Sequence, residues 1–180
     1  TCALPIFRGE FHFLTTEEIE IIKSWEGMVA FSDFDQMNLV DKDGLLAKTL
    51  NQIKIKSPER TTNQNISWLS ESLLNVLLTT SNLIKRGEFA HAHQSLSNVQ
   101  KYLLWLIRIT TDKTQHWESP TKSLEKDIDS TWYSAYETVT SDLQPENIRS
   151  SFDNSLKLTE KLFEQLNIEP KLKEILSRIR

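Results

Sequence analysis

The spacing of hydrophobic residues differs between the first 50 residues of the chain and the rest. In the first 50, short apolar or alternating segments predict β-strands, at FRGEFHFL (7–14), Met28–Phe31 and Met37–Val40. Between the first two, Thr15-Thr16-Glu17-Glu18 offers a helix N-cap with acidic residues in the first turn. A short helix with Ile19 and Ile22 on its inner side is predicted there. Two or three strands and one short helix are too little for an independent sheet.

Beyond residue 65, hydrophobic residues recur at helical spacing. Gly87 interrupts the pattern, and Pro120, Pro145 and Pro170 each predict the first turn of a helix. Short connections between long amphipathic helices are typical of an antiparallel bundle. The polar, proline-containing segment 51–65 is predicted to be a linker. The sequence therefore predicts an α+β protein that is predominantly α, with a short mixed sheet in residues 1–50 and a helical bundle in residues 66–180.

Composition excludes several classes of protein. The 180 residues are 38% hydrophobic and 26% charged, with a net charge of −4 and one cysteine, Cys2. A single cysteine rules out a disulfide framework and fits a reducing compartment. The acidic balance argues against a general nucleic-acid binder. No apolar run approaches a membrane span and no signal peptide is recognisable, so the expectation is a cytoplasmic protein without a membrane or nucleic-acid partner.

The predicted strand FRGEFHF has two different faces. Alternation places Arg8, Glu10 and His12 on one face and the phenylalanines on the other. The apolar face is suited to burial. Glu10 could be a general base or a metal ligand if the polar face lines a cleft, or a surface residue paired with Arg8. The pattern alone favours the solvated face, which is common in sheets.

Other candidate residues lie in the helical part. Lys101 and Arg108 are about two helical turns apart on one predicted face, beside Trp105, and such a pair can hold phosphates. Spacing alone favours an ordinary solvated face. Arg86 and His91 match an R-x4-H pattern of some helical nucleases, a two-residue match with a high false-positive rate. With one cysteine and no histidines four residues apart on a helix, a zinc site is not expected. The tryptophans are expected in the bundle core or at an interface.

Several longer segments resemble one family, the two-domain lincosamide nucleotidyltransferases. They are RGEFHFL (8–14), DKDGLL (41–46), KRGEFA (85–90), LSNVQKYLLWLIR (96–108) and SLEKDI (123–128). The resemblance extends from Arg8 to about Leu166. It implies a nucleotidyltransferase α/β domain, ending at about residue 50, followed by a helical bundle that binds substrate or nucleotide. It also implies a homodimer that transfers a nucleoside monophosphate from a Mg-bound nucleoside triphosphate, such as ATP, to a hydroxyl of lincomycin or clindamycin.

The resemblance also implies roles for individual residues. Glu10 stands where the family has its catalytic carboxylate, which takes the proton from the attacking hydroxyl. Arg8 and His12 would shape the same cleft, and Lys101 with Arg108 would reach the triphosphate. The family's Gly-Ser turn and paired acids, which hold two Mg ions, are expected upstream of Glu10, and this chain contains no such motif. We therefore expect the chain to be the C-terminal part of the enzyme, without metal ligands of its own and inactive by itself.

Three other functions stay open at this point. An aminoglycoside nucleotidyltransferase would use the same chemistry on a polycation, for which a strongly acidic cleft is expected. A non-enzymatic helical module could instead partner a separate nucleotidyltransferase. A helical ribonuclease using Arg86 and His91 is the most remote. An aromatic-lined, less acidic pocket would fit a lincosamide, which has one amine and an apolar substituent.

Overall fold

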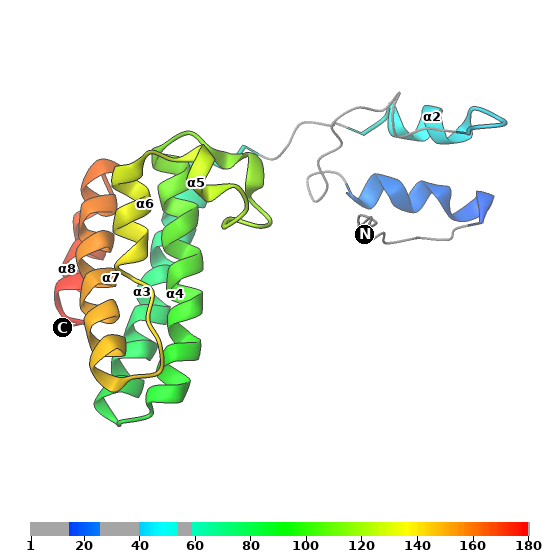
Figure 1. The fold of residues 1–180 in the computed structure, drawn as a ribbon. Helices are drawn as coiled ribbons and strands as arrows, with labels where there is room; N and C mark the ends of the chain where they lie inside the picture. The colour runs from blue at the N-terminus through cyan, green and yellow to red at the C-terminus, as the bar shows by residue number, and fades with distance from the viewer. Residues whose placement is uncertain (1–14, 26–39, 54–58, 180) are drawn as a thin grey trace, which may run out of the picture. The chain divides into compact units, whose positions relative to one another are not determined.

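The computed structural model describes residues 15–25, 40–53 and 59–179 (Figure 1). The chain divides into two compact units, Thr1–Glu59 and Arg60–Arg180. Each unit is considered separately below.

The described part of the first unit consists of two short helices that pack together. These are η1 (Thr16–Trp25), a 3-10 helix, and α2 (Leu45–Leu50). Ile22, Leu50 and Ile53 are buried between them. At the start of η1, the Glu18 carboxylate accepts hydrogen bonds from the backbone N and the hydroxyl of Thr15, 2.9 and 3.0 Å long. The predicted short helix is thus present, with Ile22 on its inner side.

The predicted strands lie outside the described residues, except for Val40 at the end of the third one. Residues 7–14, 28–31 and 37–39 are not described, and Val40 is exposed without regular secondary structure. No strand occurs in the described ranges. The helical bundle is therefore confirmed, whereas the mixed sheet is not seen.

The second unit is a bundle built on three long helices (Figure 1). They are α3 (Asn63–Lys85), α4 (Phe89–Thr110) and α7 (Pro145–Gln165). Gly87 has a φ of 76°, which favours glycine, and it closes the tight turn that makes α3 and α4 antiparallel. Four short elements complete the unit: η2 (Thr114–His116), α5 (Leu124–Asp127), α6 (Ser130–Glu137) and α8 (Pro170–Ser177).

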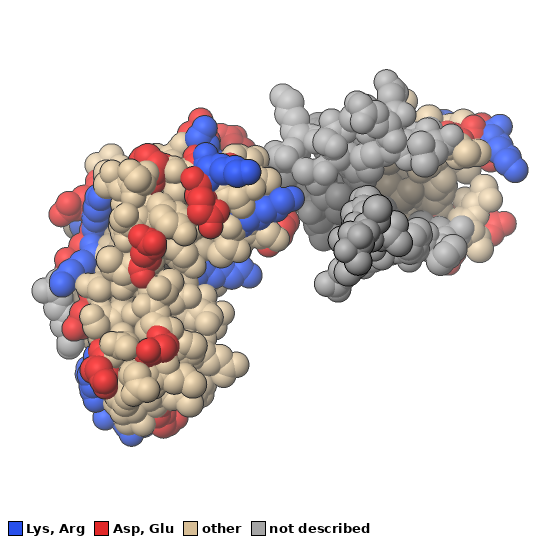
Figure 2. All heavy atoms as spheres, in the orientation of Figure 1, with Lys and Arg blue, Asp and Glu red and all other residues tan. Residues whose placement is uncertain are grey.

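The bundle core consists of the apolar positions that recur at helical spacing. Each long helix contributes residues that are at most 1% exposed, among them Leu69, Leu73 and Leu77 of α3, Leu96, Val99 and Leu103 of α4, and Ile148, Leu162 and Phe163 of α7. Periodic burial of this kind is what the sequence pattern predicted. The core fixes which faces of α3, α4 and α7 remain available for ligands. On the face of the bundle shown in Figure 2, basic and acidic side chains are interspersed.

Two of the three proline predictions are correct. Pro145 and Pro170 begin α7 and α8. Pro120 does not begin a helix: it is buried in a turn, and α5 starts only after Ser123, which has a φ of 53°. The carbonyl oxygen of Pro120 accepts a hydrogen bond from Arg108. This tertiary contact holds the segment in a turn, and no local sequence signal could reveal it.

Candidate functional site

The predicted site residues fall into two groups. Arg8, Glu10 and His12 lie outside the described residues, so their place in a common cleft stays a prediction. Lys101 and Arg108 both lie on α4 and are described. The structure does not bring these two side chains into one site.

The side chain of Arg108 is 0% exposed and binds the segment that follows α4. Its Nε donates to the carbonyl of Pro120 at 2.8 Å, and its Nη2 donates to the carbonyl of Lys122 at 2.8 Å. Its Nη1 donates both to the carbonyl of Lys113, at 2.9 Å, and to the Asp127 Oδ2, at 3.0 Å. Four of the five guanidinium N–H groups are thereby used inside the protein. Arg108 is a structural residue that holds the turns between α4 and α6.

The prediction that Arg108 shares an accessible face with Lys101 is therefore wrong. Helical spacing placed the two residues at a similar angle around α4, but the 113–128 segment covers only the end that carries Arg108. A guanidinium that is 0% exposed and uses four of its five donors inside the protein cannot also bind a triphosphate. Of the two cations, only Lys101 is exposed.

Asp127 is the charged partner of Arg108. The hydrogen bond from Arg108 holds the pKa of the Asp127 carboxyl below its usual value, and this outweighs the opposite effect of desolvation. His116 Nε2 also lies 3.8 Å from Asp127 Oδ2. The carboxylate is thus ionised and acts as an acceptor in this cluster across the ordinary pH range.

Lys101 lies at the edge of an aromatic surface formed by Trp68, Tyr102, Trp105 and Trp117. The Lys101 Nζ is 4.8 Å from the ring centroid of Trp105. The Trp105 and Trp117 rings are stacked, with centroids 5.5 Å apart and an interplanar angle of 18°. The Trp105 Nε1 donates to the Trp117 carbonyl at 2.8 Å. Trp117 is therefore attached to α4 both by stacking and by a hydrogen bond.

The aromatic surface extends toward α3 through edge-to-face contacts. Tyr102 contacts Trp105 at 5.4 Å and Trp68 at 6.2 Å between ring centroids. Trp68 is 53% exposed, so its ring is open to solvent. Arg60 lies over the Trp117 ring at 5.0 Å, and its charge is balanced by Glu118, whose Oε1 lies 3.2 Å from Arg60 Nη2. The surface combines accessible π-faces with positive charge, a combination that binds planar, apolar or anionic groups.

Sequence reasoning found the tryptophans but not this arrangement. Trp132 is buried in the core as expected, at 7% exposure. The aromatic surface depends on Trp117 folding back onto α4, which the Arg108 cluster makes possible. The local signal that could have been used is the spacing of Tyr102 and Trp105, which places them on one side of the helix.

Arg86 and His91 lie together at the turn between α3 and α4. The Arg86 Nε donates to Glu88 Oε1 at 2.6 Å, and His91 Nδ1 lies 3.5 Å from Glu88 Oε2. The hydrogen bond from Arg86 lowers the pKa of the Glu88 carboxyl. Both side chains are paired with the Glu88 carboxylate at the protein surface. This geometry gives the ribonuclease hypothesis no support.

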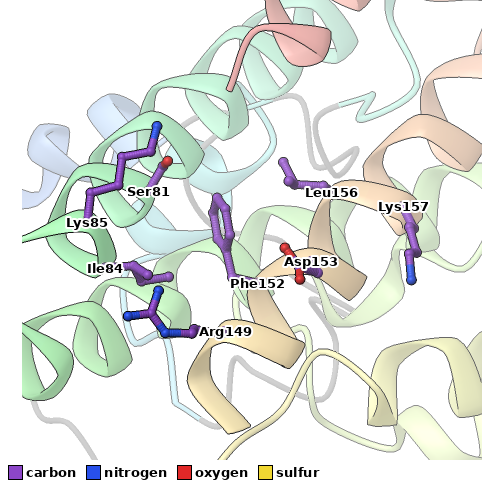
Figure 3. Close-up of a pocket in the computed structure, with 8 residues that line it drawn as sticks. All are labelled: Ser81, Ile84, Lys85, Arg149, Phe152, Asp153, Leu156 and Lys157. Carbon is purple, nitrogen blue, oxygen red and sulfur yellow. The ribbon is translucent and has the colours of Figure 1, made fainter. Parts of the chain in front are cut away.

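An open pocket of about 480 Å³ lies between α3 and α7 (Figure 3). Its floor is apolar and includes Ile84, Phe152 and Leu156, each no more than 6% exposed. Lys85 and Arg149 lie at its rim. This pocket was not predicted, because its residues come from helices that are far apart in sequence.

The described residues do not form a metal site or a membrane span. No group of three or more His, Cys, Asp or Glu side chains among them is placed to hold an ion. They therefore do not fit a Mg²⁺ site, and the two expected ions stay a prediction. No helix in the described ranges is long and apolar enough to cross a membrane.

Comparison with known families identifies the bundle. A family model for the C-terminal domain of lincosamide nucleotidyltransferase-like proteins matches residues 62–179. The chain belongs to this family. No curated protein matches the chain. The matched region begins just before α3 and ends just after α8, so the lincosamide nucleotidyltransferase-like domain coincides with the helical bundle.

Two of the segments that carried the resemblance meet in this lincosamide nucleotidyltransferase-like bundle. Residues 96–108 lie within α4, and residues 123–128 contain α5. Their ends are joined by the pair of Arg108 and Asp127, with an N–O distance of 3.0 Å. These two segments therefore hold the bundle together at this point.

Proposed function

We propose that the protein is a nucleotidyltransferase that inactivates lincosamide antibiotics. The observation that carries this proposal is the family match over residues 62–179, supported by the resemblance of RGEFHFL (8–14) to the family's catalytic segment. In the proposed reaction, the antibiotic hydroxyl oxygen forms a bond to the α-phosphorus of a nucleoside triphosphate. The bond from that phosphorus to its bridging oxygen breaks, and pyrophosphate leaves.

The chain's own residues take three roles in this proposal. Glu10 accepts the proton of the attacking hydroxyl, as a general base. Arg8 and His12 shape the cleft around that group. Lys101, exposed at the edge of the aromatic surface, contributes positive charge for the phosphates. Arg108 has no part in ligand binding, because its side chain is 0% exposed and four of its five donors are occupied inside the bundle. Mg²⁺, held outside the described residues, would neutralise phosphate charge.

The aromatic surface favours a lincosamide over an aminoglycoside as the acceptor. Lys101 lies over one ring of that surface, and the charge of Arg60 over another ring is balanced by Glu118, so the surface lacks the strong negative charge that would attract a polycation. A lincosamide carries one amine and an apolar substituent, which suits aromatic faces better. The homodimer implied by the resemblance is part of the same proposal.

The deciding experiment uses the product of the complete gene. The protein is incubated with lincomycin, Mg²⁺ and mixed nucleoside triphosphates, and a nucleotide adduct on the drug is measured by mass spectrometry. An adduct establishes the reaction and identifies the nucleotide. An adduct on an aminoglycoside but not on lincomycin would keep the reaction and make an aminoglycoside the acceptor. No adduct on either drug would favour the non-enzymatic helical module.

The role of Glu10 is tested by Glu10→Gln in the same protein. We expect turnover to fall at least about 100-fold, because general-base catalysis typically contributes that much, while folding is unchanged by circular dichroism. The matched control is Glu17→Gln, which removes the same charge from an exposed position in the first turn of η1. Activity of the Glu10 variant near that of the control would refute the assignment.

A further inference from the structure

The pocket between α3 and α7 has the size and shape of a small-molecule site. Its volume of about 480 Å³ lies within the range of ligand pockets. Ile84 of α3 and Phe152 and Leu156 of α7 form an apolar floor. In Figure 3 the Phe152 ring stands at the centre of the pocket, between Ser81 on one side and Leu156 on the other. An apolar group could therefore contact α3 and α7 together.

The rim of this pocket carries an excess of positive charge. Lys85, Arg149 and Lys157 are its basic residues and Asp153 is its single acid. This local balance is opposite to that of the chain, whose net charge is −4. None of the three cations forms an ion pair with a carboxylate among the described residues. Surface cations without carboxylate partners around a cleft raise the local concentration of anions.

The positions of the cations indicate where an anionic group would bind. Figure 3 shows Lys85 and Arg149 at the same end of the pocket, on either side of Ile84, and Lys157 at the opposite end. The Arg149 guanidinium lies 4.9 Å from the centroid of the Phe89 ring, which restrains the side chain at the rim. In Figure 3 the Lys85 ammonium is directed toward Ser81 and away from Arg149, so a head group held by both cations requires the exposed Lys85 side chain to turn toward Arg149.

We propose that this pocket binds an amphipathic organic anion, with its apolar body on Ile84, Phe152 and Leu156 and its phosphate or carboxylate between Lys85 and Arg149. The proposal concerns residues other than those of the aromatic surface, and it does not depend on the proposed transfer reaction. Asp153 weakens the positive field at the centre of the pocket. Its removal is therefore expected to strengthen binding.

The test is isothermal titration calorimetry on the full chain with four probes. Octyl phosphate and octanoate carry the proposed chemistry with two different head groups, and AMP replaces the alkyl body with a nucleoside. Octyl glucoside is the neutral control. We expect at least one anionic probe to bind several-fold more tightly than octyl glucoside and to weaken as salt increases. Comparison of the three anions identifies the head group and the body that the site prefers.

Variants then locate the site. Lys85→Gln and Arg149→Gln are each expected to weaken the best anionic probe about threefold or more, since both cations are exposed. Asp153→Asn is expected to tighten it. The matched control is Lys126→Gln on α5, which removes the same charge at an exposed position outside the pocket and should leave the affinity unchanged. All four are surface substitutions, so the fold is expected to be retained, which circular dichroism checks.

Three results would overturn the proposal. One is that no anionic probe binds. Another is that octyl glucoside binds as tightly as the anions, because charge would then have no role. The third is that the Lys85 and Arg149 variants retain the affinity of the Lys126 variant, which would place the binding elsewhere. None of these results affects the transfer reaction, which is measured by the drug adduct.

Discussion

Two regions of α4 place similar residues in opposite environments. Near its middle, Lys101 is exposed and lies 4.8 Å from the Trp105 ring. At its C-terminal end, Arg108 is 0% exposed and hydrogen-bonds to three carbonyls and Asp127. Both are cations at a similar angle around one helix. Their difference comes entirely from the 113–128 segment, which folds over one end of the helix.

The comparison shows what separates a binding cation from a structural one. A guanidinium offers five donors in a fixed plane, so it can satisfy several backbone carbonyls that a turn leaves without partners. Arg108 does this for a segment with little regular structure of its own. The ammonium group of Lys101 remains available to a ligand. Substitutions at these residues and at their partners test this contrast.

Arg108→Met should be strongly destabilising. The substitution leaves three carbonyls and the Asp127 carboxylate without their donors in a water-poor site, and breaking a buried ion pair in this way typically costs about 3–5 kcal/mol. The free energy of unfolding is measured by urea unfolding, followed by circular dichroism. Lys101→Met is the matched control on the same helix. Equal free energies of unfolding for the two variants would contradict the structural role of Arg108.

Asp127→Asn should destabilise less than Arg108→Met, in a pH-dependent way. Because the folded-state pKa of Asp127 is lowered from 3.8, the stabilisation by its charge is present above that value and is lost as the pH falls through the folded pKa. The stability difference from wild type should therefore be largest near neutral pH and shrink below about pH 4. Asp112→Asn, at an exposed position, is the control. A difference that does not vary with pH would contradict the assigned ion pair.

Trp105→Phe should cost about 1 kcal/mol of stability, since it removes the hydrogen bond from Trp105 Nε1 to the Trp117 carbonyl while keeping a ring. The stacked contact with Trp117 would also weaken. Near-ultraviolet circular dichroism should report the change in the Trp pair. Trp68→Phe, at the exposed end of the aromatic surface, is the control and should change stability less.

Lys101→Met should have the smallest effect on folding and a clear effect on ligand binding. Its cation–π contact is exposed, so the loss of stability should be no more than about 1 kcal/mol. In the complete gene product, we expect the KM for the nucleoside triphosphate to rise several-fold with little change in folding. An unchanged KM would remove Lys101 from the proposed site.

Much of the bundle could be predicted from the sequence. The apolar positions of α3, α4 and α7, the break at Gly87 and the starts at Pro145 and Pro170 are local signals, and the structure confirms them. The candidate site could be predicted only in part. Lys101 was recognised as an accessible cation, but the burial of Arg108 and the pocket lined by Ile84, Arg149 and Phe152 were not recognised.

The helices of the bundle follow from the sequence alone, because each amphipathic pattern has one face that must be buried whatever its partner is. The sequence also carries the segments by which the family is recognised. Tertiary contacts determine which cation is covered, that Pro120 lies in a turn, and that cations from α3 and α7 flank one pocket. These features depend on contacts between residues that are distant in the chain, and helical spacing specifies only the direction of a side chain, not what lies over it.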